Sequence, residues 1–273
     1  MIEFDHVSRT FGRKQAVADL TLRISAGELF AFLGPNGAGK TTTIKMLVGL
    51  LRPTSGTVRV GGFDTAGQTR QATQLMGYVP DQPYLYDKLS GREFLDFVAE
   101  LRGLDRRRAA AAIDRQSGRF ELDGFLDDLT ETYSHGMKQR LVFAAALLHA
   151  PAVLVVDEPM VGLDPKSMKM VKDLLRELAS AGTIVFMSTH TLNVAEEIAD
   201  RIGIIDRGQL GFLGTLEDLR ARRSQAGDRG PASRTSLEQL FLELTSNHRD
   251  PGGNHHAAAA DHKELGSRRP EQE

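Results

Sequence analysis

The chain has 273 residues, 41% of them hydrophobic, which is enough for one main globular domain with a core of its own. Its 34 lysines and arginines are balanced by 36 acidic residues, and this net charge of -2 argues against a sequence-independent grip on nucleic acid. The absence of cysteine excludes disulfides and thiolate metal sites. Residues 1–10 do not have the pattern of a signal peptide, and the apolar runs fall short of the roughly 18 residues that span a bilayer, so we expect neither export nor a transmembrane helix.

Two antiparallel strands with one solvated face are predicted at the start of the chain. Residues 2–7 alternate between apolar and polar, and Leu20, Leu22 and Ile24 alternate again. Phe11 is expected on the loop between these strands. At that place an aromatic ring serves equally well as a stacking surface for a flat base or as an apolar plug at the edge of the sheet.

An apolar strand over residues 29–33 leads into a glycine-rich turn, residues 34–41, of the pattern G-x-x-x-x-G-K-[ST], and a helix is predicted over 42–51. This pattern is typical of a nucleotide-phosphate site, because glycines with positive φ let backbone N–H groups approach phosphate oxygens. Lys40 is expected to reach the β- and γ-phosphates, and Thr41 to offer its hydroxyl to Mg²⁺. The predicted nucleotide contacts are Gly34, Asn36, Gly37, Ala38, Gly39, Lys40, Thr41 and Thr42.

Short strands at residues 57–60 and 75–79 are followed by a region, about 88–150, that is predicted to be all helical. In its first helix, Phe94, Leu95, Val98 and Leu101 are expected to share one apolar face. Further helices are predicted over 106–120 and 137–149. The region is therefore interpreted as a helical insertion into an α/β body.

The second half of the main domain alternates strands with helices. Its predicted strands are 152–156 and 183–187, its predicted helices are 166–180 and 192–199, and a hairpin of 202–205 with 210–213 closes it. This alternation predicts a mostly parallel, layered α/β sheet. The fold class expected is that of a P-loop NTPase with an N-terminal antiparallel β subdomain and a helical insertion.

Three polar side chains stand at the ends of the two buried strands. Asp157 and Glu158 follow the valine-rich run 152–156, and His190 follows the next strand. Because an open parallel sheet places its ligand crevice at the carboxyl ends of the strands, these residues are candidates for holding Mg²⁺ and for catalysis. An imidazole in that position can donate a hydrogen bond to a γ-phosphate.

The order of motifs resembles the ATP-binding cassette of ABC transporters. The phosphate loop is followed by Tyr-Ser-His-Gly-Met-Lys-Gln-Arg at 133–140, by Val-Leu-Val-Val-Asp-Glu-Pro at 153–159, by Gly-Leu-Asp-Pro at 162–165 and by Ser-Thr-His at 188–190. The match covers about residues 2–219 in the family's order and spacing. The resemblance implies an ATP-hydrolysing subunit that works in a dimer.

The resemblance also implies roles for single residues. Ser134 and Gly136 would belong to a signature segment that contacts the ATP held by a second cassette, and Asp164 would communicate across that interface. Glu158 would orient or deprotonate the attacking water, and Lys40 would bind its ATP. Asp157 would act through Mg²⁺, His190 would be the switch residue, and Phe11 would stack on adenine.

Two positions depart from the family's usual pattern. The signature is commonly Leu-Ser-Gly-Gly-Gln, whereas His135 stands at its third position here, and a histidine lacks glycine's freedom at positive φ. Asp81 stands where a glutamine usually contacts the metal and the transport partner. Its carboxylate remains a candidate metal ligand.

The expected organisation is an ABC ATPase domain at residues 1–222 with a helical subdomain at about 88–150, a linker and short C-terminal helix at 223–246, and a disordered tail at 247–273. The function implied is an ATP- and Mg²⁺-dependent homodimeric subunit at the cytoplasmic face of the membrane. It would power a separate permease, and Asp81 and residues 236–244 favour an ABC-2-like exporter. Two alternatives are less favoured. Cassette ATPases that act on nucleic acid or ribosomes usually carry two cassettes, a long coiled coil or zinc cysteines, and this sequence shows none of these. A regulatory module that binds ATP without hydrolysing it has no need of a general base such as Glu158.

Overall fold

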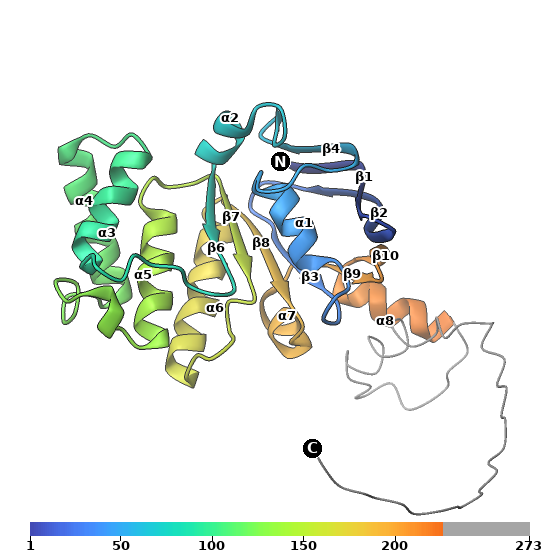
Figure 1. Cartoon of the computed structure of the whole chain (residues 1–273). Helices are drawn as coiled ribbons and strands as arrows, with labels where there is room; N and C mark the ends of the chain where they lie inside the picture. The colour runs from blue at the N-terminus through green and yellow to red at the C-terminus, as the bar shows by residue number, and fades with distance from the viewer. Residues whose placement is uncertain (226–273) are drawn as a thin grey trace, which may run out of the picture.

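A six-stranded sheet forms the centre of the molecule in the computed structural model, which describes residues 1–225 (Figure 1). The strand order is β10-β9-β3-β8-β7-β6, and neighbouring strands are parallel except for the β9–β10 hairpin. Because β3, β7 and β8 are buried on both faces, their sequences are continuous apolar runs rather than alternating ones. The strands are β3 (Leu29–Leu33), β6 (Met76–Val79), β7 (Val153–Asp157), β8 (Ile184–Thr189), β9 (Arg201–Asp206) and β10 (Gln209–Gly214).

A second, antiparallel sheet has the order β2-β1-β4-β5 and confirms the predicted N-terminal β subdomain. Its strands are β1 (Ile2–Phe11), β2 (Lys14–Ile24), β4 (Ser55–Val60) and β5 (Phe63–Asp64). The prediction that Phe11 lies on a loop is wrong. Phe11 is the last residue of β1 and pairs with Lys14, so the connecting turn is only Gly12 and Arg13.

Helices α1, α2, α6, α7 and α8 belong to the body that carries the two sheets. Helix α1 begins at Lys40 and ends at Leu47, earlier at both ends than predicted. Its start is set by Gly39, which is the N-cap and lies in the left-handed region. The short elements α2 and β5 had no clear sequence signal. The helices are α1 (Lys40–Leu47), α2 (Thr69–Gln74), α6 (Pro165–Ser180), α7 (Leu192–Ile198) and α8 (Leu216–Gln225).

The helical region lies on the opposite side of the central sheet from the antiparallel strands (Figure 1). It consists of α3 (Gly91–Leu101), α4 (Arg106–Phe120), a 3₁₀ turn (Thr130–Thr132) and α5 (His135–Leu147). The capping box formed by Ser90 and Glu93 fixes the start of α3. The predicted apolar face of α3 is wrong at Leu101, which is 70% exposed at the last position of the helix, while Ala99 is buried.

The apolar core divides into two clusters, one on each face of the central sheet. Phe30 and Phe32 of β3 face the antiparallel sheet. The alternate residues of the same strand, Leu29, Ala31 and Leu33, face the helices on the other side. Phe186 of β8 packs between the sheets, with its ring centroid 6.4 Å from that of Phe4 and 5.7 and 5.5 Å from those of Phe30 and Phe32. This packing fixes the position of the two sheets relative to each other. It therefore also fixes the relative position of the loops that follow β1 and β3.

The predicted domain boundary after residue 222 falls inside α8, which ends at Gln225. Most of the predicted linker and C-terminal helix, and all of the predicted tail, lie outside the described residues. Among the helices of residues 1–225, none is long and apolar enough to cross a bilayer.

Candidate active site

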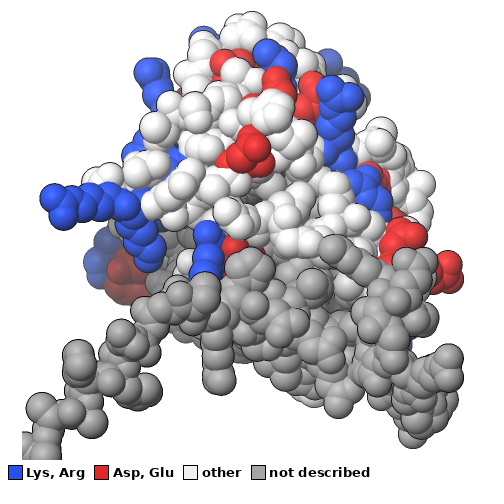
Figure 2. All heavy atoms as spheres, turned by 90° about the vertical axis from the view of Figure 1, so that its right-hand side faces the viewer, with Lys and Arg blue, Asp and Glu red and all other residues white. Residues whose placement is uncertain are grey.

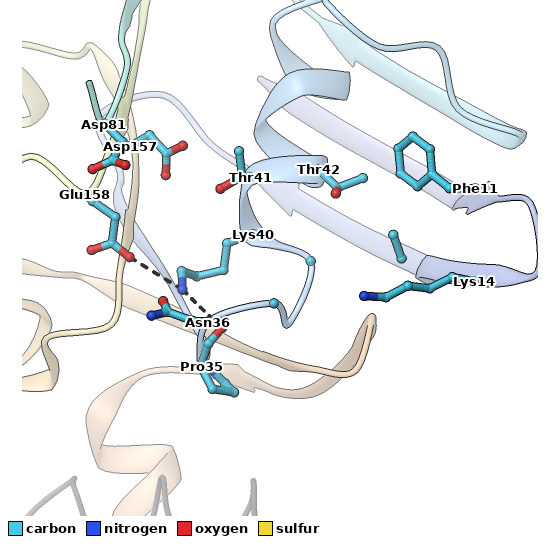
Figure 3. A pocket seen from close by; sticks show the side chains of 13 residues that line it. Phe11, Lys14, Pro35, Asn36, Lys40, Thr41, Thr42, Asp81, Asp157 and Glu158 are labelled. Atoms are coloured by element: carbon cyan, nitrogen blue, oxygen red, sulfur yellow. Dashed lines mark hydrogen bonds and ion pairs between the residues drawn. The ribbon is translucent and has the colours of Figure 1, made fainter. Parts of the chain in front are cut away.

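A cavity of about 360 Å³ opens between the phosphate loop, the turn that joins β1 to β2, and the carboxyl end of β7 (Figure 3). It brings together segments that lie more than a hundred residues apart in the chain. The residues that line it are Phe11, Lys14, Ala16, Pro35, Asn36, Gly37, Gly39, Lys40, Thr41, Thr42, Asp81, Asp157 and Glu158.

Glycine is needed in the phosphate loop for two different physical reasons. Gly37 and Gly39 have φ values of 81° and 116°, as the sequence predicted. Gly34 does not have a positive φ, so that part of the prediction is wrong. A Cβ on Gly34 would lie 2.4 Å from the carbonyl oxygen of Ile205, and the glycine is needed because β9 passes so close.

The remaining residues of the loop divide between the cavity and its support. Asn36 and Thr42 line the cavity. Ala38 is buried, and its carbonyl oxygen accepts a hydrogen bond of 2.8 Å from the N–H of Gly208 in the β9–β10 turn. Ala38 therefore holds the loop in place rather than facing the cavity.

Lys40 is the cation at the centre of the site and is only 6% exposed. Its ammonium group donates to the carbonyl oxygens of Gly34 at 2.7 Å and Pro35 at 3.3 Å, and its Nζ lies 3.5 Å from Oε1 of Glu158. A buried ammonium without an anionic partner is costly, so the contact with Glu158 offsets its charge here. Phosphate oxygens entering the cavity would be a second anionic partner for the same group.

Glu158 stands between Lys40 and His190. Its Oε2 accepts from the backbone N–H of His190 at 3.2 Å and lies 2.9 Å from Nδ1 of that ring. Glu158 itself has φ of 49°, a backbone conformation that is costly for a residue with a side chain and that is concentrated at functional sites. Its side chain is 12% exposed, so the carboxylate is placed at the cavity wall with access to water.

Asp157, Asp81 and Thr41 form the oxygen-rich wall of the cavity (Figure 3). Burial raises the pKa of Asp157, while a hydrogen bond donated by the Ser188 hydroxyl opposes that rise. Burial, together with the charges of Asp157 and Asp81, raises the pKa of Tyr78 to about 12. The charges of Glu158 and Asp81 also raise the pKa of Asp157, and a cation bound at this wall would offset that repulsion.

Oxygen donors of this kind suit Mg²⁺, which commonly binds to one or two carboxylates together with substrate phosphates. Within residues 1–225 there is no group of three or more carboxylate, histidine or cysteine side chains that could hold a metal ion by itself. The wall therefore fits a Mg²⁺ that arrives with a nucleotide rather than one held in a protein cage.

Phe11 lies at the far end of the cavity from Glu158 and is 47% exposed (Figure 3). The guanidinium of Arg9 covers its ring, with Cζ 4.5 Å from the ring centroid, and the Arg9 side chain donates to the carbonyl oxygen of Arg52 at 2.9 Å. The ring thus lines the cavity from a fixed position. This geometry favours the stacking role over that of an apolar plug.

Ser134, Gly136 and Asp164 are not among the residues that line the cavity. Ser134 is the N-cap of α5, and its hydroxyl accepts from the N–H of Met137 at 3.3 Å. Asp164 caps α6 by accepting from the N–H groups of Lys166 and Ser167 at 2.9 and 3.0 Å. The Ser167 hydroxyl donates to the same carboxylate at 2.6 Å, and this bond, followed by the backbone bond from Ser167, lowers the pKa of Asp164.

His135 and Gly136 are the first two residues of α5, and neither has a positive φ. The expectation that a histidine at the third signature position lacks a needed freedom is therefore wrong. The segment is already helical at that point, and a side chain is accommodated.

Neither Lys14 nor Ala16 is predicted as a site residue from the sequence, and no role is predicted for Ser188 although the Ser-Thr-His motif begins there. Lys14 and Ala16 line the cavity from β2, and Ser188 holds both Asp157 and the N–H of Glu158 through its hydroxyl. The position of Lys14, directly after the tight turn that follows Phe11, is a signal that could have placed it in the site once the hairpin was recognised. The role of Ser188 depends on the β7–β8 register, in which it pairs with Asp157.

Known proteins share both the sequence and the fold of this chain. The model of the family described as "ABC transporter" matches residues 17–161. The linearmycin resistance ATP-binding protein LnrL of Bacillus subtilis is 37% identical over 81% of this chain and 71% of its own length. The daunorubicin/doxorubicin resistance ATP-binding protein DrrA of Streptomyces peucetius is 37% identical over 91% of this chain and 77% of its own length.

Solved structures of ABC cassettes have the same fold as this chain. An ATP-binding subunit of an ABC transporter superposes with a TM-score of 0.81 and 30% identity over 89% of this chain and 99% of its own. The cassette MJ0796, in a dimeric post-hydrolysis state bound to ADP and phosphate, superposes with a TM-score of 0.68 and 26% identity over 79% of this chain and 99% of its own. The chain therefore belongs to the ABC transporter family, as one of its ATP-binding and ATP-hydrolysing cassettes.

Proposed function

We propose that the chain is the ATPase subunit of an exporter, and that it works as a homodimer bound to a separate membrane-spanning permease at the cytoplasmic face of the membrane. The observation that carries this proposal is the placement of the signature segment. The N-terminus of α5 is exposed and does not line the cavity of its own chain.

The exposed end of α5 is suited to bind an anion from another molecule. An added Cβ at Gly136 would meet nothing within 4 Å, so the backbone there faces open space. A 13-residue helix concentrates partial positive charge at its N-terminus, where its first N–H groups have no helical partner. In a head-to-tail dimer this end would face the γ-phosphate of the ATP held by the other subunit, with Asp164 near the same interface.

Within one subunit, the principal residues of the site would have separate roles. Phe11 would stack on the base, the loop around Gly37 and Gly39 would hold the phosphates, and Lys40 would neutralise them. Mg²⁺, held by Thr41, Asp157 and Asp81, would supply charge neutralisation for the transferred phosphoryl group. Glu158 would accept the proton of the attacking water, and His190 would contact the γ-phosphate.

The named relatives favour export of small toxic molecules. The name of LnrL refers to linearmycin resistance, and that of DrrA refers to daunorubicin and doxorubicin resistance. A cargo of that kind is therefore proposed here. A protein partner is proposed rather than nucleic acid, because the chain has no excess of basic residues. On the face in Figure 2, basic and acidic side chains are interspersed among uncharged ones wherever the chain is described, and the net charge is -2.

Replacing Glu158 with Gln tests the ATPase and the dimer together. The variant should bind ATP normally and lose at least about 10²-fold in turnover, because the proton acceptor is gone. Trapped with ATP, it should sediment as a dimer. The matched control is Glu100→Gln, at an exposed position of α3, which should turn over normally and stay monomeric after hydrolysis. Undiminished turnover by Glu158→Gln, or a monomer at saturating ATP, would contradict the proposal.

Export is tested by expressing the chain together with candidate permeases and measuring efflux of daunorubicin from cells. Efflux should require the chain and should be lost in Lys40→Ala, which weakens nucleotide binding because the buried cation is missing. Co-purification of the chain with the permease should survive that substitution. Efflux that persists with Lys40→Ala would show that ATP binding by this chain does not drive the transport.

A further inference from the structure

His135 makes a contact that the usual glycine at this signature position cannot make. Its Nε2 lies 3.3 Å from the carbonyl oxygen of Val161. The ring also covers Gly162, since a Cβ added there would lie 3.1 Å from Cδ2 of His135. The side chain at the start of α5 therefore rests on the segment between Glu158 and Asp164.

The chemistry of this contact fixes the proton on the ring. A carbonyl oxygen only accepts, so Nε2 of His135 must carry the hydrogen. Both the neutral tautomer with the proton on Nε2 and the charged imidazolium can donate it. The contact is therefore available at neutral pH without any change of charge.

The segment that His135 touches is short and is fixed at both ends. The N–H of Val161 donates to the carbonyl oxygen of Glu158 at 3.3 Å, which closes a turn directly after the proposed proton acceptor. At its other end, Asp164 caps α6. His135 thus completes a continuous path of contacts from the N-terminus of α5, through Val161, to the backbone of Glu158.

We propose that His135 is a positioning residue that couples the two ATP sites of the dimer. The inference rests on the proposed function, in which the N-terminus of α5 serves the ATP of the partner and Glu158 serves the ATP of its own chain. Through His135, a shift of α5 toward the partner's γ-phosphate would move Val161 and the turn that begins at Glu158. Contact of α5 with the partner's ATP would then change the position of Glu158 at the ATP site of its own subunit.

Three substitutions separate the hydrogen bond from the volume of the ring. His135→Gly removes both, and His135→Leu keeps bulk without a donor. His135→Gln keeps a donor, because its amide nitrogen lies as many bonds from Cα as Nε2 of histidine does. Arg106→Gly is the matched control, since Arg106 is also the first residue of a helix behind a capping side chain and is exposed.

The contact itself is tested by hydrogen exchange in the full-length protein without nucleotide. The probes are the amide of Val161, which donates to Glu158, and that of Leu163, which donates to the carbonyl oxygen of Met160 at 3.5 Å. Exchange should be about 10-fold faster in His135→Gly and His135→Leu, and near the parent rate in His135→Gln and Arg106→Gly. Unchanged exchange in His135→Gly overturns the positioning role, whatever the oligomeric state of the protein.

The coupling is tested by the dependence of ATPase rate on ATP concentration. Two coupled sites give the parent a Hill coefficient approaching about 2, which should fall toward about 1 in His135→Gly and His135→Leu and be kept in His135→Gln. The KM for ATP should stay within about twofold, because His135 does not line its own cavity.

The outcomes distinguish this inference from the proposed function. An uncooperative parent, or an unchanged Hill coefficient in His135→Gly while the Glu158→Gln protein still dimerises on ATP, overturns the coupling alone. Failure of Glu158→Gln to dimerise overturns the proposed function and the coupling together.

Discussion

At the scale of the residue, His149 shows how a buried histidine away from the active site can set the response to pH. It follows α5, and its Nε2 donates to the carbonyl oxygen of Met76 in β6 at 3.1 Å. Burial, followed by the nearby charge of Arg102, lowers the pKa of His149 to about 4 from the ordinary value of 6.5. The folded protein therefore keeps this ring neutral under conditions in which the unfolded chain protonates it.

The sign of the effect follows from this difference in pKa. Well above pH 6.5 both states are neutral and His149 has almost no influence on stability. As the pH falls from 6.5 towards 4, only the unfolded state gains the proton, so the free energy of unfolding decreases. Between pH 7.5 and pH 5 this loss should be about 2 kcal/mol. Urea denaturation at the two pH values measures it.

The control for the pH effect is His149→Gln, whose amide keeps a donor for Met76 but does not titrate. Its loss of stability between the two pH values should be smaller than that of the parent by about the same 2 kcal/mol. An equal loss in both proteins would show that His149 is not the responsible group.

At the scale of the element, the phosphate loop depends on the close approach of its first glycine to β9. Gly34→Ala should lower the free energy of unfolding by about 1–3 kcal/mol, because the new Cβ overlaps a backbone oxygen that has no rotamer to move to. ATP affinity should fall with it, since the loop must shift to relieve the overlap. Urea denaturation and ATP titration measure the two effects.

Gly118 of α4 provides the opposite case. Its surroundings are open, its φ is not positive, and it lies within a helix. Gly118→Ala should therefore stabilise the protein by about 0.5–1 kcal/mol without changing ATP affinity. If both alanine variants had the same effect on stability, the crowding at Gly34 would not be the reason for that glycine.

At the scale of the whole molecule, the four phenylalanines between the sheets join the antiparallel layer to the central one. Phe186 is fully buried and is the member that packs against all the others. Phe186→Ala should cost about 3–5 kcal/mol in the free energy of unfolding. Phe97→Ala, at a ring that is 38% exposed, should cost far less. A small effect of Phe186→Ala would show that other contacts hold the layers together.

The sequence by itself determined the elements whose local signals agree with their surroundings. The helix over 106–120 follows from residue periodicity, and the buried strand predicted at 152–156 and found at 153–157 follows from its apolar run. The phosphate loop and the order of motifs along the chain are enough to indicate the family. These features are local, so the chain encodes them within a few turns of helix or one strand.

Only the tertiary structure decided which distant residues meet. The need for glycine at position 34 comes from β9, and Ser188 reaches Asp157 only through the pairing of β7 with β8. His135 likewise contacts Val161 across 26 positions of the chain. These contacts depend on sheet register and on the packing of separate segments, and no local pattern records them, because the partners are brought together only when the core is formed.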